Sequence, residues 1–132
     1  MMETDDSGED MLSVYKETIG STIPCYANSQ ALGLKNNDRI EGNIHRQLFT
    51  KDVPLTSIKG MIGHTFASMG VIQMISAFIS IEYGFIPPTI KTGKKGFEDL
   101  PIVCEPIYQP VRSVSITAHG NSGNNACAIV TK

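Results

Sequence analysis

The pattern of hydrophobic and polar residues alternates between helical and extended periodicity in the first half of the chain. Residues 9–19 and 38–48 repeat apolar side chains every three to four positions, which predicts two amphipathic helices, the second capped by the asparagines before it. The short β-rich runs 22–27 (TIPCYA) and 53–58 (VPLTSI) predict strands. The intervening SQALGLKNN is expected to be a loop.

The second half of the chain begins with a long apolar segment. Residues 64–83 are apolar on nearly every side, which predicts a helix that ends at Gly84, before a Pro-Pro pair. After the polar loop KTGKKGFEDLP, residues 110–118 and 124–132 alternate as two strands joined by the glycine-rich turn HGNSGN. This order of elements predicts an α/β fold, with a mixed β-sheet layered with helices, one of them apolar all round and buried.

Composition limits the class of protein. The 132 residues are 41% hydrophobic and 18% charged, which is typical of one soluble domain with a real core. The formal net charge of -2, without a basic cluster interleaved with aromatic residues, argues against nucleic acid as a partner. Residues 1–8 are acidic and are interpreted as a mobile leader before a domain at 9–132; they lack the positive start of a secretory signal.

The cysteines and the apolar segment bear on the cellular setting. Three cysteines lie far apart without a C-x-x-C pair, which indicates packed free thiols in a reducing, cytoplasmic compartment. Residues 61–84 approach the length of a membrane span but include His64, Gln73 and Glu82. We interpret the segment as a core helix and expect no membrane span.

The stretch KGMIGHT places Lys59 and His64 among small and apolar residues, between a predicted strand and the long helix. At a helix N-terminus the backbone dipole disfavours positive charge, so the pKa of His64 is expected to be lowered. A neutral imidazole there can donate a hydrogen bond to a substrate oxygen, and Lys59 can polarise a neighbouring group. A packed histidine and a solvated lysine are the alternative interpretation.

Three segments resemble the C-terminal part of the β-ketoacyl-acyl-carrier-protein synthases, the ketosynthases of fatty-acid and polyketide synthesis. Residues 55–90 are similar to the family's K-x-x-x-G-H-x-x-x-x-x-G signature with its following helix and Pro-Pro turn. Residues 37–49 resemble the D-x-x-E helix, and residues 111–130 resemble the closing hairpin. The resemblance covers nearly the whole chain after the leader and implies the second half of a thiolase-like fold.

The resemblance also implies site residues and partners. Lys59 and His64 match the family's catalytic lysine and second catalytic histidine, which assist decarboxylation of a malonyl thioester and its condensation with a cysteine-bound acyl chain. Glu41 matches a carboxylate expected to pair with Lys59, whereas Asp38 is expected to cap its own helix. The implied partner is an acyl carrier protein, whose phosphopantetheine holds the substrates, and no other cofactor is implied.

The chain also departs from the family pattern. The half with the nucleophilic cysteine is not present, and Asn28 is assigned to the place of the first catalytic histidine. An asparagine can donate a hydrogen bond to an oxyanion but cannot exchange a proton near neutral pH. The closing turn keeps Gly120 and Gly123, but His119 and its neighbour Asn121 replace aromatic residues of the family.

Two functional hypotheses follow. In the first, the chain is the C-terminal part of a ketosynthase and is inactive until another chain supplies the cysteine half. In the second, it is a non-catalytic subunit, similar to a chain-length factor, that binds an acyl carrier protein or a condensing partner. Either way, the all-apolar helix predicts a partner half or self-association. A metal site is disfavoured by the histidine spacing, and His45 is interpreted as a surface partner of Glu41.

Overall fold

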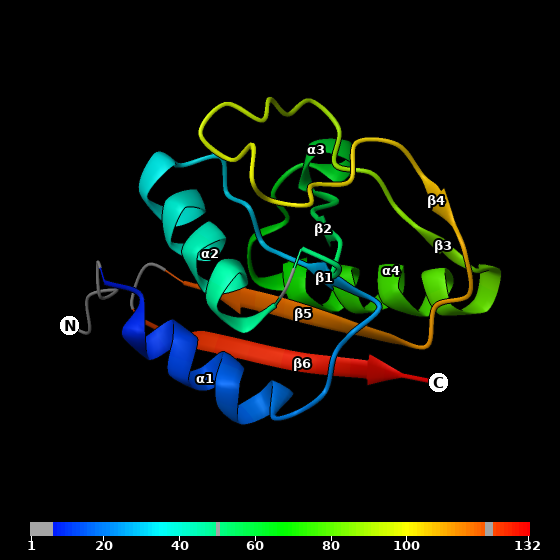
Figure 1. Cartoon of the computed structure of the whole chain (residues 1–132), viewed down its shortest axis with the longest axis horizontal. Helices are drawn as coiled ribbons and strands as arrows, with labels where there is room; N and C mark the ends of the chain where they lie inside the picture. Colours follow the sequence, from blue (N-terminus) through cyan, green and yellow to red (C-terminus); the bar gives the residue numbers. More distant parts are fainter. Residues whose placement is uncertain (1–6, 50, 121–122) are drawn as a thin grey trace.

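A four-stranded mixed sheet forms the centre of the protein (Figure 1), in a computed structural model that describes residues 7–49, 51–120 and 123–132. Its strand order is β2-β1-β5-β6, with β2, β1 and β5 parallel and β6 antiparallel to β5. The strands are β1 (Tyr26–Asn28), β2 (Leu55–Thr56), β5 (Ser113–His119) and β6 (Asn125–Thr131). The α/β layering and the mixed sheet predicted from the sequence are confirmed.

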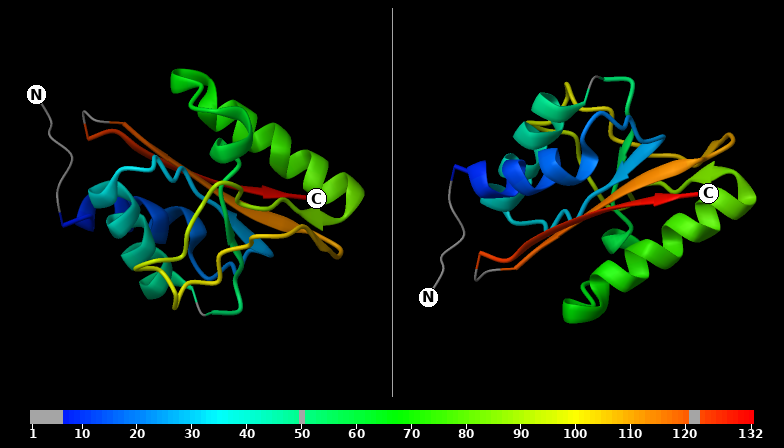
Figure 2. Two further views of the ribbon diagram at one scale, coloured as in Figure 1. Left: turned by 90° about the horizontal axis from the view of Figure 1, so that it is seen from above. Right: turned by 90° about the horizontal axis from the view of Figure 1, so that it is seen from below.

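Helices cover the two faces of this sheet (Figure 2). Helices α1 (Glu9–Ile19) and α2 (Lys35–Leu48) lie on one face, and α4 (Met69–Tyr83) lies on the other. Smaller elements complete the chain: α3 (Lys59–Ile62), a 3₁₀ turn (Phe66–Ser68) and the antiparallel pair β3 (Phe85–Ile86) and β4 (Ile107–Tyr108).

Each face of the sheet has its own apolar core. The first cluster joins α4 to the sheet and includes Tyr26, Ala77 and Val114, all fully buried. The second joins α1 to α2, with Tyr15 and Ile40 among its buried members. Alternate residues of β5 and β6 point to opposite faces, so both strands contribute to holding the helices in place.

Several element boundaries differ from the prediction. The second helix begins at Lys35, three residues before the predicted Asp38, and its N-cap Leu34 makes no side-chain cap hydrogen bond. The helix predicted from residue 64 begins at Met69, because Gly63 (φ 77°) and Phe66 (φ 52°) leave helical geometry just before it. The segment around His64 is therefore an independent loop, and not the first turn of the long helix.

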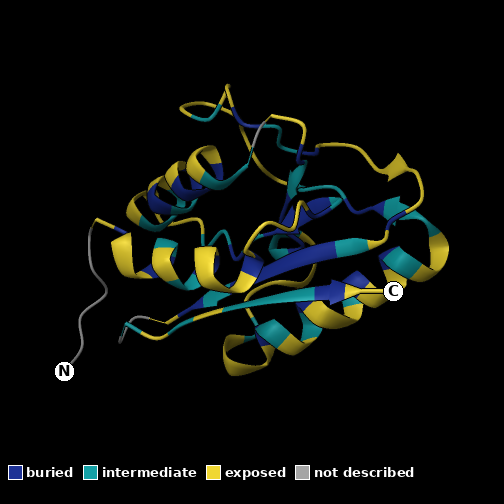
Figure 3. Cartoon of the chain, turned by 60° about the horizontal axis from the view of Figure 1, so that its bottom comes forward, coloured by how far each residue is buried: buried dark blue, intermediate teal, exposed yellow. Residues whose placement is uncertain are grey.

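Much of helix α4 is exposed to solvent (Figure 3). The residues that it buries against the sheet are Met69, Gln73, Ala77 and Ser80. Six large apolar residues lie exposed on the remaining surface: Val71, Met74, Ile75, Phe78, Ile79 and Tyr83. The sequence predicts a helix that is buried between two halves of the full fold, and the apolar surface expected of this chain by itself is confirmed. We call this surface the α4 outer face.

Residues 66–83 are long and apolar enough to cross a membrane, with a mean hydropathy of 1.3 and 22% of the segment buried. Gln73 nevertheless ties this helix to the sheet. Its Nε2 donates to the carbonyl oxygens of Asn28 and Thr117, each at 3.2 Å, and its side chain is fully buried. The helix is thus anchored by polar contacts as well as by apolar packing.

We expect Gln73→Leu to lower the free energy of unfolding by about 2 kcal/mol, because two buried hydrogen bonds are lost while the volume of the side chain stays similar. Chemical denaturation of both proteins measures the difference. Ser76→Ala, a change on the same helix but at a position outside its buried stripe, is the control and should shift stability by less than about 0.5 kcal/mol. An equal loss in the two variants would contradict the role of Gln73.

Two sequence-based interpretations of side chains are corrected here. His45 is not a surface partner of Glu41: it is buried, and its Nε2 lies 3.0 Å from the carbonyl oxygen of Val53. The cysteines are free but not deeply packed, since Cys25 and Cys127 are half-buried and Cys104 is exposed. Burial lowers the pKa of His45, which keeps it neutral in the core.

Candidate active-site groove

A groove of about 860 Å³ opens at the end of the sheet where β1 and β5 finish. Three segments meet there: the loop after β1, the stretch from His64 to Gly70, and the β5–β6 turn. The carboxyl ends of parallel strands are a common ligand position in α/β proteins. Its walls mix apolar and polar side chains, among them Gln30, Leu34, His64, Phe66 and Met69. We call this candidate site the active-site groove.

His64 is exposed on the rim of the active-site groove. Its ring lies 4.7 Å, centre to centre, from the ring of Phe66, which is itself 79% exposed. Phe66 adopts a positive φ, a costly conformation for a bulky residue that is found most often at functional sites. The dipole argument for His64 does not apply, because the α4 N-terminus lies five residues further along the chain.

Lys59, the other charged residue of KGMIGHT, begins the one-turn helix α3. Its Nζ is buried and has no hydrogen-bond partner among the described residues. Burial lowers the pKa of Lys59, and the negative charges of Glu41 and Asp38 partly oppose this effect. Lys59 is therefore electrostatically coupled to the carboxylates of α2 without touching them.

Glu41 contacts the chain after β1 and not Lys59, which corrects the predicted ion pair. Its carboxylate accepts hydrogen bonds from the backbone N–H groups of Ala31 at 3.1 Å and Gln30 at 3.2 Å. Burial raises the pKa of Glu41 to about 7. The Glu41 carboxylate thus holds the loop that forms one wall of the active-site groove.

His119, at the end of β5, approaches the same carboxylate. Its Nε2 lies 3.4 Å from Oε1 of Glu41, a close approach without hydrogen-bond geometry, and only 1% of its side chain is exposed. Burial, with the positive charge of Lys59, lowers the pKa of His119 to about 4. At neutral pH the buried pair therefore consists of a neutral imidazole and a partly ionised carboxyl group. The sequence did not indicate this pairing.

Asn28 and Gln30 follow each other closely at the end of β1 but lie in different places. Asn28 is fully buried beneath the loop, and neither polar atom of its side chain has a partner among the described residues. Gln30, two residues on, borders the active-site groove together with His64. The assignment of Asn28 to a substrate contact stays a prediction. Sequence reasoning missed Gln30 because a single glutamine in a loop has no motif of its own.

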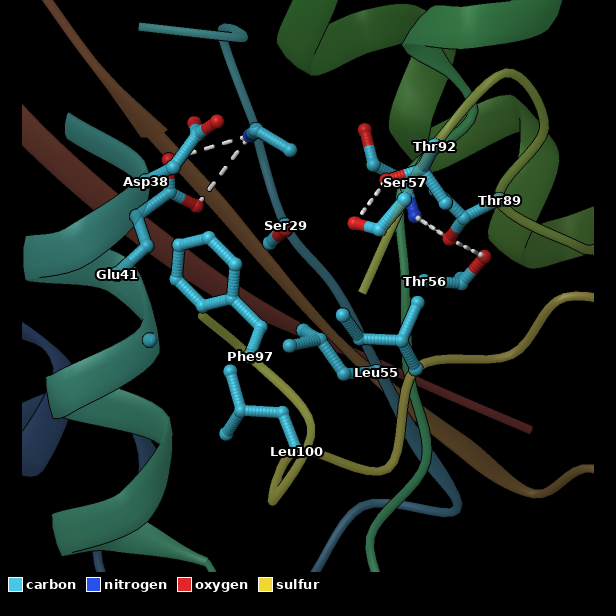
Figure 4. A pocket seen from close by; sticks show the side chains of 14 residues that line it. Ser29, Asp38, Glu41, Leu55, Thr56, Ser57, Thr89, Thr92, Phe97 and Leu100 are labelled. Atoms are coloured by element: carbon cyan, nitrogen blue, oxygen red, sulfur yellow. Dashed lines mark hydrogen bonds between the residues drawn. The ribbon is translucent and has the colours of Figure 1, made fainter. Parts of the chain in front are cut away.

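A smaller pocket of about 150 Å³ lies between α2, the loop after β1 and β2 (Figure 4). Glu41 and Phe97 lie on one side of it, and Leu55 and Ser57 on the other. Asp38, which also lines it, accepts a hydrogen bond from the Gly33 backbone at 3.2 Å and so stabilises the preceding loop. The predicted capping of the helix by Asp38 is wrong, because α2 begins at Lys35 with Leu34 as its N-cap and no side-chain cap hydrogen bond.

The β5–β6 turn closes the groove. Gly120 donates its backbone N–H to the carbonyl oxygen of Asn124 at 2.8 Å, and Gly123 adopts a φ of 80°, which glycine tolerates best. Gly120 also borders the groove, as predicted for the turn. Asn121 lies outside the described residues. Within the parts of the chain that are described, no group of three or more His, Cys, Asp or Glu residues could hold a metal ion.

Comparison with known proteins identifies the family. The profile of the β-ketoacyl synthase C-terminal domain matches residues 11–92, more than half of the chain. The chain belongs to this family. Within it, the chain is 29% identical over 117 residues to the tetracenomycin polyketide synthase ketoacyl synthase alpha subunit of Streptomyces glaucescens, covering 81% of this chain and 26% of that protein.

Other ketosynthases are similar in sequence or in fold. A citrinin polyketide synthase of Monascus ruber is 34% identical over 87 residues, 59% of this chain and 3% of that protein. The solved ishigamide ketosynthase/chain length factor superposes with a TM-score of 0.87 at 22% identity, covering 98% of this chain and 34% of that one. The chain therefore has a thiolase-like ketosynthase fold of the polyketide-synthase type, and it spans about a quarter or less of the curated relatives described above.

Proposed function

We propose that this domain provides the Lys59–His64 half of a decarboxylating ketosynthase site. The observation that carries the proposal is the position of the family signature KGMIGHT. His64 lies on the rim of a groove, and the charge of Lys59 interacts with the carboxylates of Glu41 and Asp38. His64 would donate a hydrogen bond to the thioester oxygen of a malonyl group as the carboxylate leaves. Lys59 would stabilise negative charge near this site.

The proposed site also needs the half that carries the nucleophilic cysteine. The α4 outer face is the surface that this half would cover, because this face is apolar and unpartnered in the described chain. The substrates would be carried on the phosphopantetheine of an acyl carrier protein in the cytoplasm. Two similar solved structures support pairing with a partner half and with a carrier protein: one is a ketosynthase/chain length factor, and the other a type II acyl-carrier protein in complex with its ketosynthase.

Malonyl-carrier-protein decarboxylation tests the proposal. The purified chain is assayed alone and mixed with a polypeptide that supplies the N-terminal cysteine half, and the mass of each species in solution is recorded. We expect release of CO₂ only in the mixture, together with a heteromeric mass. Absence of decarboxylation in a stable complex would contradict the enzyme hypothesis.

In the active mixture, His64→Ala should lower the decarboxylation rate by about 100-fold, since one donor to the developing negative charge is lost. Because His64 is exposed, this change should leave the fold intact, and a circular dichroism spectrum checks this. Lys94→Ala, in the exposed loop after β3, is the matched control and should leave the rate unchanged. An unaltered rate in His64→Ala would remove His64 from the mechanism.

A non-catalytic role is the second candidate. The observation that favours it is the groove wall formed by the loop after β1. Gln30 lies in this wall, and a glutamine cannot exchange a proton near neutral pH. In that case the domain would bind a condensing partner or an acyl carrier protein through the same surfaces, as a chain-length factor does. Stable binding without decarboxylation separates this role from the first.

A further inference from the structure

The pocket of about 150 Å³ next to α2, which we call the α2 pocket, is separate from the active-site groove. None of the described residues lines both. Thr92 and Gly93, at the edge of the α2 pocket, are exposed, so it opens to solvent on that side. Its volume leaves room for one benzene-sized ring. A small molecule can therefore enter the α2 pocket without passing through the groove.

The α2 pocket has an apolar side and a polar side (Figure 4). Leu55, Phe97 and Leu100 gather in the lower part of the view, whereas Asp38 lies in the upper part. Phe97 and Leu100 pack closely on α2 because Gly42 has no side chain: a methyl group there would lie 3.2 Å from each of them. An aromatic ring in the pocket would thus find apolar contacts on one side and hydrogen-bonding groups on the other.

Asp38 supplies the acceptor on the polar side. Its Oδ1 accepts the backbone N–H of Gly33 at 3.2 Å, which is its one hydrogen bond among the described residues. Glu41 is more fully used, because Ala31 and Gln30 donate their backbone N–H groups to its two oxygens. An ionised carboxylate can accept about four hydrogen bonds, so Oδ2 of Asp38 keeps spare capacity for a ligand.

The charges around the α2 pocket select a neutral ligand. Lys59 interacts electrostatically with both Asp38 and Glu41, and its Nζ is buried without a hydrogen-bond partner among the described residues. A cationic ligand would be repelled by this buried ammonium group, and an anionic ligand by the two carboxylates. A neutral hydroxyl group can donate to Asp38 without either cost.

We propose that the α2 pocket binds a small phenol, with the ring packed against Phe97 and the hydroxyl group donating a hydrogen bond to Asp38. The inference goes beyond the proposed function and does not depend on it. A bound phenol would lie against Glu41, whose carboxylate holds the backbone of Gln30 in the wall of the active-site groove. The α2 pocket is therefore a second binding site, joined to the groove by Glu41.

Phenol and toluene provide a matched pair of probes, because a methyl group replaces the hydroxyl group at nearly the same size. Their dissociation constants are measured for the full chain by ¹H–¹⁵N NMR titration, which also locates the bound probe through the amides of Gly42, Ser57 and Phe97. We expect phenol to bind about tenfold more tightly than toluene, although its hydroxyl group must give up hydrogen bonds to water. Benzylammonium and benzoate should each bind about tenfold more weakly than phenol, because each brings a charge.

Two substitutions test the two sides of the α2 pocket. Phe97→Ala removes the ring contact and should weaken phenol binding about tenfold. Asp38→Asn keeps an oxygen for the Gly33 N–H but replaces the free acceptor with a donor, so the preference for phenol over toluene should fall to about twofold or less. Phe78→Ala removes the same side chain from the α4 outer face and is the matched control, with a change of less than about twofold.

Each outcome decides the inference. Absence of phenol binding, tighter binding of toluene, benzylammonium or benzoate, chemical-shift changes confined to the α4 outer face, or an undiminished preference for phenol in Asp38→Asn would overturn it. A preference for phenol that is lost in Asp38→Asn and kept in Phe78→Ala supports it. Thermal unfolding checks the fold of each variant, and Asp38→Asn keeps the test decisive if Phe97→Ala unfolds. No partner half or carrier protein takes part, so this site and the proposed ketosynthase reaction fail or stand separately.

Discussion

Replacing Glu41 with glutamine should make the free energy of unfolding rise steeply between pH 4 and pH 6.5. Over this range the rise should exceed that of the wild type by about 3 kcal/mol. The reason is the buried pair at the back of the active-site groove. Glu41 and His119 have pKa values displaced by burial in opposite directions, to about 7 and about 4. In the wild-type protein their contributions to the pH dependence oppose each other.

The sign follows from the protons bound in each state. The folded-state pKa of His119 is below its ordinary value of 6.5, so its stabilising contribution is present above pH 6.5 and is lost as pH falls through 4. The folded-state pKa of Glu41 is above its ordinary value of 4.5, so its contribution is present below pH 4.5 and is lost as pH rises through 7. A pKa difference of about 2.5 between the folded and the unfolded state corresponds to about 3 kcal/mol in the free energy of unfolding.

The complementary variant provides the control. His119→Gln leaves Glu41 alone, so its unfolding free energy should fall with rising pH between 4.5 and 7, the opposite direction from Glu41→Gln. Urea denaturation at half-unit pH steps measures all three profiles. Asp38, Lys59 and Tyr15 also face this pair, but they are common to every protein compared. Parallel profiles for the two variants would contradict the assignment of opposite shifts.

Gly60→Ala is expected to lower the free energy of unfolding by about 2 kcal/mol. A methyl group at this position would overlap the carbonyl oxygen of Ile90, which is backbone and cannot rotate away. The substitution should also displace the segment from Lys59 to His64, because Gly60 lies within α3. Chemical denaturation measures the loss of stability.

Gly70→Ala is the matched control for this prediction. Gly70 lies in the first turn of α4, and a methyl group there meets nothing within 4 Å. Because alanine favours helix over glycine, this variant should be equal to the wild type or more stable by up to about 1 kcal/mol. A loss of stability at Gly70 as large as that at Gly60 would show that the close approach of Ile90 is not the cause.

Local sequence patterns predicted those parts of the fold that depend on neighbouring residues. The helix at 9–19 was predicted with its observed boundaries, because its apolar spacing and the glycine after it are local signals. The hairpin of β5 and β6 was predicted for the same reason, from two alternating runs around a glycine-rich turn. The start of α4 was not, since a positive φ at Phe66 has no signature in its residue type.

The α4 outer face shows where periodicity is insufficient. A helix that is apolar all round needs cover on every side, but in this chain only a narrow stripe including Gln73 and Ala77 meets the sheet. Which side faces the sheet depends on the size and polarity of the opposing strands, and these are brought together only by the fold. The exposed remainder is the surface that the proposed partner would cover.

The sequence by itself determined the family, the order of the longer helices and of the four strands of the main sheet, and the candidates Lys59 and His64, because these are encoded in contiguous motifs. Only the tertiary structure decided that Glu41 meets His119 and the loop after β1, that Gln30 and not Asn28 borders the groove, and that His45 is a core residue. These contacts join residues distant in sequence, whose polar side chains acquire burial, partners and shifted pKa values only when the sheet brings them together.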